Sequence, residues 1–180
     1  MDNKVNLKPV PYTNLSKVIY LYGFAMWMTI ITFNNIIDSG TNTLFIEQMI
    51  SMSNFNPDSV IGSGLLWKAI PLNYASPIAS FILWFVVIVE IIIDVLMWRA
   101  FFKVLKLTIQ KKQLDENCIA CVNLALCSFM GIFVLFITGG IWFGYWMHQG
   151  QFQLAHLISI IISLLGLIYF NQNRSSISNK

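Results

Sequence analysis

The amino-acid sequence predicts an all-α integral membrane protein: an antiparallel four-helix transmembrane bundle with a structured extracytoplasmic loop of short helices between spans one and two. Three observations predict it: the composition, four long apolar stretches, and the placement of the cations. Apolar residues make up 57% of the 180 residues and charged residues 11%, against about 45–50% and about 25% in soluble domains. A soluble chain of this length could not bury so much apolar surface, and the composition also excludes a disordered chain.

Four apolar stretches, at residues 18–37, 78–98, 118–138 and 154–170, supply the spans. A helix needs about 20 mostly apolar residues to cross the hydrocarbon of a bilayer. The first and third stretches carry no charge, the second carries two carboxylates, and the fourth is the shortest. Because no segment of soluble character separates them, we expect residues 1–180 to form a single membrane domain.

The lysines and arginines are unevenly distributed among the connecting segments. Ten of the eleven fall before span one, between spans two and three, or after span four, and Lys68 is the exception. Cytoplasmic loops carry an excess of Lys and Arg, so both termini are expected in the cytoplasm. The net charge of +3 is too small to indicate a nucleic-acid partner, and the partner that the composition indicates is the lipid bilayer.

The two longer connecting segments differ in character. In the extracytoplasmic loop 38–77, apolar residues at helical spacing over 43–52 and a cap-like start at 58–70 predict two short helices. We expect these helices on the outer membrane surface or over the bundle. The cytoplasmic loop 99–117 carries five cations, so we expect it to lie along anionic headgroups.

Glu90 and Asp94 lie inside span two, four residues apart and therefore on one face of a helix. Asp94 is close enough to the inner surface to reach headgroups or Arg99. Glu90 is nine residues from Arg99, roughly 13 Å deeper at the helical rise, where an unsatisfied carboxylate costs several kcal/mol. Two interpretations stay open: Glu90 joins helices through hydrogen bonds, or it forms a proton-accepting or cation-binding site.

Depth in the bundle indicates which side chains could meet Glu90. The candidates are polar residues of the other three spans at a comparable distance from the cytoplasmic side. They are Asn123, Ser128, Ser159, Ser163 and Tyr22.

Polar and aromatic residues gather at the predicted extracytoplasmic ends of the spans. Asn34, Asn35, Asp38 and Asn42 close span one, and the turn after span three contains Gly139, Gly140, Trp142, Phe143 and Trp146. The first cluster either ends the helix and forms a turn or contributes oxygen atoms to a ligand site. The aromatic turn either anchors the chain at the interface or forms one wall of an outward-facing pocket.

The sequence predicts no metal site and no cofactor. Cys118 and Cys121 have the Cys-x-x-Cys spacing but lack a second cysteine pair, so with Cys127 they are interpreted as ordinary buried or interfacial thiols. His148 and His156 fall on the same side of the membrane, which does not suit haem ligation between helices. No hydrolase, metalloprotease or phosphate-loop motif occurs, so the sequence does not indicate an enzyme.

The same residues carry a resemblance to a known family. They are Asn34, Asn35, Asp38, Asn42, Phe45, Ser51-Met52, Trp67-Lys68-Ala69-Ile70, Glu90 and Gly139-Gly140-x-Trp142-Phe143-x-x-Trp146. Over most of its length the chain resembles the bacterial family of predicted small integral membrane proteins, domain of unknown function 2165. Where the family has Trp-Arg-Ala-Ile, this chain has Trp-Lys-Ala-Ile. The lysine lacks the planar guanidinium group, which can form two parallel hydrogen bonds. The resemblance implies a four-span bacterial inner-membrane protein and no activity, and it adds Trp67 and Lys68 to the expected outer pocket or partner surface.

The function that we expect is that of a non-enzymatic accessory or interaction subunit, in contact with another membrane protein or with further copies of itself. Transporters often use paired repeats, and four helices rarely suffice for one. Two alternatives stay open. One is a small transporter or a proton or cation conduit that uses Glu90, and the other is a lipid- or quinone-binding membrane enzyme.

Overall fold

The computed structural model describes residues 11–172, which fold into α-helices and short 3-10 helices without a strand. The long helices are α1 (Pro11–Ile37), α3 (Leu72–Ile109), α4 (Glu116–Trp142) and α5 (Gly150–Asn171), and the short ones are α2 (Ser39–Ser51), η1 (Ser63–Lys68) and η2 (Tyr145–Met147). All four long helices are long and apolar enough to cross a membrane, which confirms the prediction of an all-helical chain with four candidate spans. Four of the cations used to orient the chain, Lys4, Lys8, Arg174 and Lys180, lie outside the described residues.

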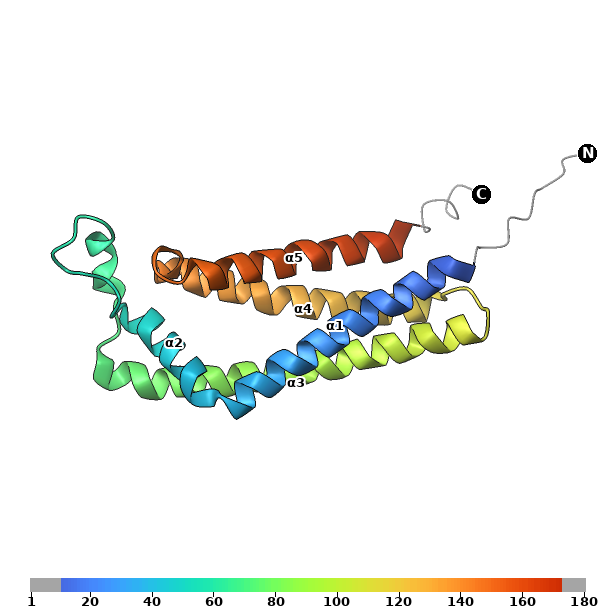
Figure 1. Cartoon of the computed structure of the whole chain (residues 1–180), viewed down its shortest axis with the longest axis horizontal. Helices are drawn as coiled ribbons and strands as arrows, with labels where there is room; N and C mark the ends of the chain where they lie inside the picture. The colour runs from blue at the N-terminus through green and yellow to red at the C-terminus, as the bar shows by residue number, and fades with distance from the viewer. Residues whose placement is uncertain (1–10, 173–180) are drawn as a thin grey trace, which may run out of the picture.

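The long helices lie lengthwise beside one another (Figure 1). One end of the molecule holds the start of α1, the connection from α3 to α4, and the end of α5. We term it the basic end, because lysines of α1, α3 and the connection lie there. The opposite end, termed the cap end, holds η1, η2 and the start of α3. α1 packs mainly on α3, and α4 packs mainly on α5.

α1 ends beside the middle of α3, and α2 continues toward the cap end along the other half of α3 (Figure 1). Asn35 of α1 hydrogen-bonds to Glu90, halfway along α3. Ile50 of α2 packs on Ala75 and Ala79, near the start of α3. The sequence placed this short helix on the outer surface or over the bundle. In the structure it packs along α3, where the two small alanines leave room for its apolar side chains.

α3 extends beyond the predicted span 78–98 at both ends. Its 38 residues correspond to about 57 Å at the helical rise, more than the roughly 40–45 Å of a bilayer with its headgroups. At the cap end Ala75 packs on α2, and at the basic end Phe101 and Val104 are buried in the main core. Because these contacts stabilise the added turns, most of the predicted cytoplasmic loop 99–117 is helical.

The second short helix predicted in the extracytoplasmic loop is only partly formed. The sequence predicts a helix over 58–70, whereas the structure has turns followed by η1. Gly62 adopts a φ of +80°, and a Cβ atom at this position would meet the ring of Phe55. Such a left-handed residue cannot continue a helix. After η1, the Ile70 N–H donates to the carbonyl oxygen of Ile50 at 2.9 Å, which ties the loop to α2.

The main core lies between the four long helices toward the basic end. Its most buried large side chains come from every one of these helices: Leu21, Met28, Met97, Leu126, Phe129 and Phe170. The outer faces carry large exposed apolar side chains, such as Phe81 on α3, Leu135 on α4 and Leu165 on α5. An exterior of this kind is suited to contact with lipid chains rather than water.

Candidate functional site

A polar pair joins α1 to α3 in the middle of the bundle. Glu90 is only 1% exposed, and the Asn35 Nδ2 group donates to both of its carboxyl oxygens, at 2.8 Å each. Hydrogen bonds between polar side chains hold helices together in a membrane, where no water competes for them. The sequence singled out both residues but did not predict that they pair.

A second polar contact lies one turn farther along the same face of α3. Thr29 Oγ1 donates to Asp94 Oδ1 at 2.8 Å and accepts from the indole Nε1 of Trp98 at 3.0 Å. The Ala25 carbonyl oxygen is another acceptor for this hydroxyl, at 2.9 Å. Asp94 therefore meets α1 and not Arg99, whose side chain is exposed. Both carboxyl groups of α3 face α1, as their spacing of four requires.

The candidate partners on α4 and α5 make other hydrogen bonds. Asn123 pairs with Asn171 of α5 through two amide hydrogen bonds of 3.1 and 2.8 Å. Ser159 and Ser163 are buried, and each donates to a carbonyl oxygen one turn earlier in its own helix, at 2.8 and 2.6 Å. The buried serines of α5 thus satisfy their hydroxyl groups locally.

The other two candidates also lack a hydrogen bond to Glu90. Tyr22 is 48% exposed and packs edge-on against the ring of Trp98. Within residues 11–172, no hydrogen bond joins Ser128 to Glu90. The physical reason is that α1 packs against the face of α3 that carries Glu90. Asn35 is the α1 residue level with Glu90, whereas Tyr22 is level with Trp98.

The junction between α1 and α2 is polar and exposed. The Asp38 side chain accepts from the Thr41 N–H at 3.4 Å as the N-cap of α2. Asn42 Nδ2 donates to the Asp38 carbonyl oxygen at 3.1 Å. Asn34 and Asp38 are both exposed. In this structure the cluster ends one helix and begins the next, which is one of the two roles that its composition indicated.

This junction lies at the depth of apolar, lipid-facing side chains. Asn35 is level with Glu90, to which it hydrogen-bonds. Toward the cap end the exposed face of α3 stays apolar as far as Phe81, which is 73% exposed. Phe81 is nine residues from Glu90, roughly 13 Å at the helical rise. The exposed Asn34 and Asp38 therefore lie inside the apolar band and not at its edge.

At the cap end, Lys68 lies between two exposed tryptophans. Its Nζ atom is 4.4 Å from the ring centre of Trp142 and 5.6 Å from that of Trp67, and it donates to the Trp142 carbonyl oxygen at 3.2 Å. Trp67 is 74% exposed and Trp142 53%, and their rings meet edge to face. A cation over an indole ring is attracted by its π electrons. Lys68 thereby joins η1 to the end of α4.

The two glycines at the end of α4 have different surroundings. A Cβ atom at Gly140 would lie 2.1 Å from the ring of Tyr145, whereas one at Gly139 would meet nothing within 4 Å. Tyr145 is buried, its hydroxyl group lies 3.3 Å from His156 Nδ1, and burial raises the pKa of this hydroxyl. Gly140 thus allows the Tyr145 ring to pack directly on the backbone of α4.

The residues predicted for one outer pocket fall into two groups. Asn34, Asn35, Asp38 and Asn42 lie at the α1–α2 junction, and Trp67, Lys68, Gly139, Gly140 and Trp142 lie at the cap end. Phe143 packs against the small core under the cap, and Trp146 is half exposed. Among the described residues, no hydrogen bond or ring contact links the two groups.

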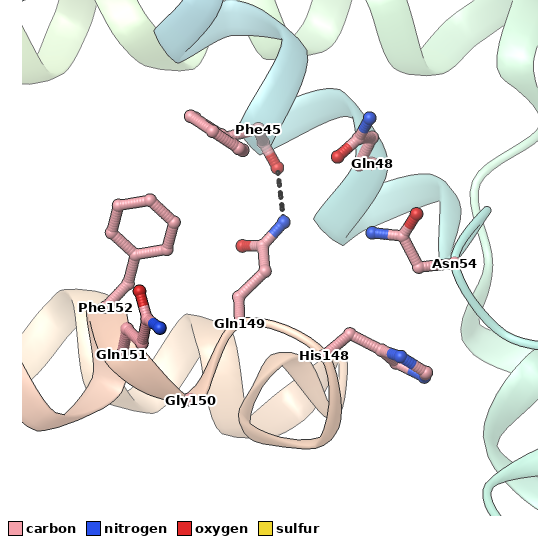
Figure 2. A pocket seen from close by; sticks show the side chains of 8 residues that line it. All are labelled: Phe45, Gln48, Asn54, His148, Gln149, Gly150, Gln151 and Phe152. Carbon is pink, nitrogen blue, oxygen red and sulfur yellow. Dashed lines mark hydrogen bonds between the residues drawn. The ribbon is translucent and has the colours of Figure 1, made fainter.

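A cleft of about 290 Å³ lies between α2 and the start of α5 (Figure 2). Gln149 reaches across it, and its Nε2 group donates to the Phe45 carbonyl oxygen at 3.5 Å. Gln48 lies on the α2 side and Gln151 on the α5 side. The sequence analysis predicted no site here. The signal that could have found it is the run of glutamines that begins directly after His148.

The described part of the chain contains no group of three or more His, Cys, Asp or Glu side chains that could hold a metal ion. Cys118, Cys121 and Cys127 are free thiols, the first two buried. His148 packs edge-on against the ring of Phe55, and His156 lies among aromatic rings of α4 and η2. Both histidines are therefore surrounded by aromatic rings and not by side chains that could complete a metal site.

Sequence reasoning missed the partner of Glu90 because it placed Asn35 at the outer end of span one and Glu90 deep inside span two. On that assumption Asn35 lies at the membrane edge, too far from Glu90 to touch it. The available signal was the group of Asn34, Asn35 and Asp38, followed directly by another helix-forming segment, which indicates that the helix ends here. Thr29 was missed for a different reason, since a threonine inside an apolar stretch is common and carries little information.

Comparison with known proteins identifies a family. A family model described as predicted small integral membrane protein, domain of unknown function 2165, matches residues 13–173. That range includes all four candidate spans and every polar contact described above. Neither a curated protein nor a solved structure matches the chain.

Proposed function

Since the chain belongs to the family of predicted small integral membrane proteins, we propose that it is a non-enzymatic interaction subunit, which binds another membrane protein through the α1–α2 junction. The observation that carries this proposal is the exposure of Asn34 and Asp38 within the apolar band. A polar or charged group that faces lipid chains is costly, and such groups normally face protein or a water-filled cavity.

The backbone at the junction adds to the same argument. The last carbonyl groups of α1 and the first N–H groups of α2 have few partners within their own helices. Asp38 and Asn42 satisfy some of them. Hydrocarbon offers no hydrogen bonds to the remainder. A partner helix with polar side chains would supply them, and the exposed Phe33 and Ile37 beside the junction would pack around that contact.

The proposal includes the membrane topology. The four spans form an antiparallel bundle in a bacterial inner membrane, with the basic end and both termini in the cytoplasm. The support for this orientation is the excess of cations at the basic end. Lys17, for example, lies 5.4 Å from the ring centres of Tyr169 and Phe170 at this end, and Lys111 and Lys112 follow α3.

Photo-cross-linking in the native membrane tests the partner surface. A benzoylphenylalanine replaces Phe33 beside the junction, and in a matched control it replaces Leu135, an exposed apolar residue of α4. We expect a protein adduct from position 33 and only lipid adducts from position 135. Mass spectrometry then separates a different protein from a second copy of the chain. Lipid adducts alone at position 33 would overturn the proposal.

Substitution of the polar residues gives an independent test. Asn34→Leu combined with Asp38→Asn removes one exposed amide and the carboxyl group of the junction but retains a residue type that caps α2. We expect this variant to fold and to lose the protein adduct. Asn73→Leu, at an exposed asparagine near the start of α3, is the control and should keep it.

A proton or cation conduit is the second candidate, and Glu90 is the observation in its favour. A carboxyl group that is 1% exposed and halfway along a span is the usual mark of an ion pathway. Against this candidate, Asn35 already binds both carboxyl oxygens. We therefore favour the role in which this pair joins α1 to α3.

A further inference from the structure

We propose that the cleft between α2 and the start of α5 binds a neutral, hydroxyl-rich group, a sugar ring or a similar polyol, carried by a lipid headgroup or free in solution. This inference goes beyond the interaction subunit proposed above and does not depend on it. The cleft uses different residues from the α1–α2 junction, so either proposal can fail alone.

The side chains that line the cleft determine the charge of its ligand. Four of them are primary amides, from Gln48, Asn54, Gln149 and Gln151, and no Asp, Glu, Lys or Arg lines it. The remaining polar side chain is that of His148, whose ring packs against Phe55. Phosphate and carboxylate ligands are bound most strongly where Arg or Lys forms charge-assisted hydrogen bonds, and amines where Asp or Glu does. The lining therefore selects an uncharged ligand.

The amides also have hydrogen-bonding capacity that the fold does not use. Within residues 11–172, the side chains of Gln48, Asn54 and Gln151 make no hydrogen bond to other residues, and Gln149 makes a long one to Phe45. Each amide has two donor hydrogens and an acceptor oxygen. A hydroxyl group likewise donates and accepts, so a ligand with several hydroxyl groups matches this set of amides.

Two aromatic rings give the cleft an apolar corner. The rings of Phe45 and Phe152 lie 5.1 Å apart at an angle of 59°, one from α2 and one from α5 (Figure 2). A sugar ring presents C–H groups on its faces and hydroxyl groups on its rim, which fits an aromatic corner beside amides. The volume of about 290 Å³ is at the lower limit of the roughly 300–1,000 Å³ of small-molecule sites, so it suits one ring and not a larger ligand.

Native mass spectrometry of the full chain in lipid nanodiscs tests the proposal. The nanodiscs contain equal amounts of dioleoylglycerol, its monoglucosyl derivative and dioleoyl phosphatidylcholine, which share their acyl chains. We expect the wild-type protein to retain the glucosyl lipid above the other two. Loss of one amide should weaken retention about fivefold, the factor for roughly 1 kcal/mol per hydrogen bond.

The double variant Gln48→Met and Gln151→Met removes two amides at nearly constant shape and should lose the preference. Gln151→Met alone, at an exposed position, is used if the double variant does not fold. Gln113→Met, in the turn before α4, is the control and should behave as the wild type. Equal retention of the three lipids, or an unchanged preference in the folded cleft variants, would overturn the proposal.

Methyl glucoside added to the nanodiscs distinguishes the two sources of the ligand. Displacement of the glucosyl lipid at millimolar concentration would show that a free sugar suffices for binding. If the glucosyl lipid stays bound in the presence of methyl glucoside, and the cleft variants still lose the preference for it, the ligand is a lipid headgroup. Both results support a hydroxyl-rich ligand, and each assigns its origin.

Discussion

The amide nitrogen of Asn35 lies 2.8 Å from each carboxyl oxygen of Glu90. This contact joins the last turn of α1 to the middle of α3, so the junction between α1 and α2 lies beside the middle of α3. Without it, α1 would have an apolar contact with α3 but no side-chain hydrogen bond at this level. The exposed junction that carries the proposed partner surface follows directly after this pair.

Asn35→Ala should destabilise the folded protein by about 1–3 kcal/mol, since it leaves the buried carboxyl group of Glu90 without a partner. Asn34→Ala changes the neighbouring, exposed residue and should cost less than about 0.5 kcal/mol. Thermal or denaturant unfolding of the purified variants in detergent measures both. Equal stability of the two variants would contradict the pairing.

Glu90→Gln should fold normally and leave the proton permeability of proteoliposomes unchanged. Glutamine can still accept a hydrogen bond from Asn35, but it cannot carry a proton across the bilayer. A pH-sensitive dye inside the vesicles reports the flux. If the wild-type protein conducts protons above the background of empty vesicles and the variant does not, Glu90 belongs to a conduit and the interaction role gives way to it.

Gly140→Ala should disturb the cap end, because the added methyl group would overlap the ring of the buried Tyr145. Overpacking of this kind costs about 1–3 kcal/mol. Gly139→Ala is a matched control with open space around its Cβ, and it should be neutral or slightly stabilising because alanine favours a helix. Unfolding midpoints of the two variants, compared with the wild type, decide between these outcomes.

Lys68→Met should loosen η1 without unfolding the four spans. The substitution removes the contact of the ammonium group with the rings of Trp142 and Trp67 and its hydrogen bond to the Trp142 carbonyl oxygen. A partly exposed cation–π contact contributes about 0.5–1 kcal/mol. Hydrogen exchange of residues 63–69 should accelerate severalfold. Lys112→Met, at the basic end, should leave that segment unchanged, and equal exchange in both variants would argue against the contact.

The proposed topology predicts which cysteines a membrane-impermeant thiol reagent can reach. After Cys118, Cys121 and Cys127 are replaced by alanine, Val60→Cys at the cap end and Gln113→Cys at the basic end provide exposed sites. In intact bacterial cells the reagent should label position 60 at once and position 113 only after the membrane is permeabilised. The reverse order would place the basic end outside the cytoplasm.

Several elements of the candidate site could be predicted because they depend on residues close in sequence. The spacing of four between Glu90 and Asp94 predicts that both face one neighbour, and both contact α1. The identity of that neighbour could not be predicted. Depth matching pointed to four residues of α4 and α5 and to Tyr22 of α1, whereas the partner is Asn35, near the end of α1 and beside the middle of α3.

The cleft illustrates the same limit. Gln48 and Gln151 are about a hundred positions apart in the chain, and neither belongs to a motif. They line one cleft only because α2 packs along α3 while α5 returns beside α4. No local pattern records such an arrangement, so the sequence analysis predicted nothing at this place.

The sequence by itself determined that the chain is a membrane protein with four candidate spans, because hydrophobicity along the chain is a local property and a bilayer selects for it directly. The tertiary structure alone decided where α1 ends relative to α3, which residue binds Glu90, and which amides share a cleft. These features depend on how helices of similar composition fit together. In an apolar medium that fit is decided by small side chains such as Ala75 and Ala79 and by a few hydrogen bonds, and neither can be inferred from hydrophobicity.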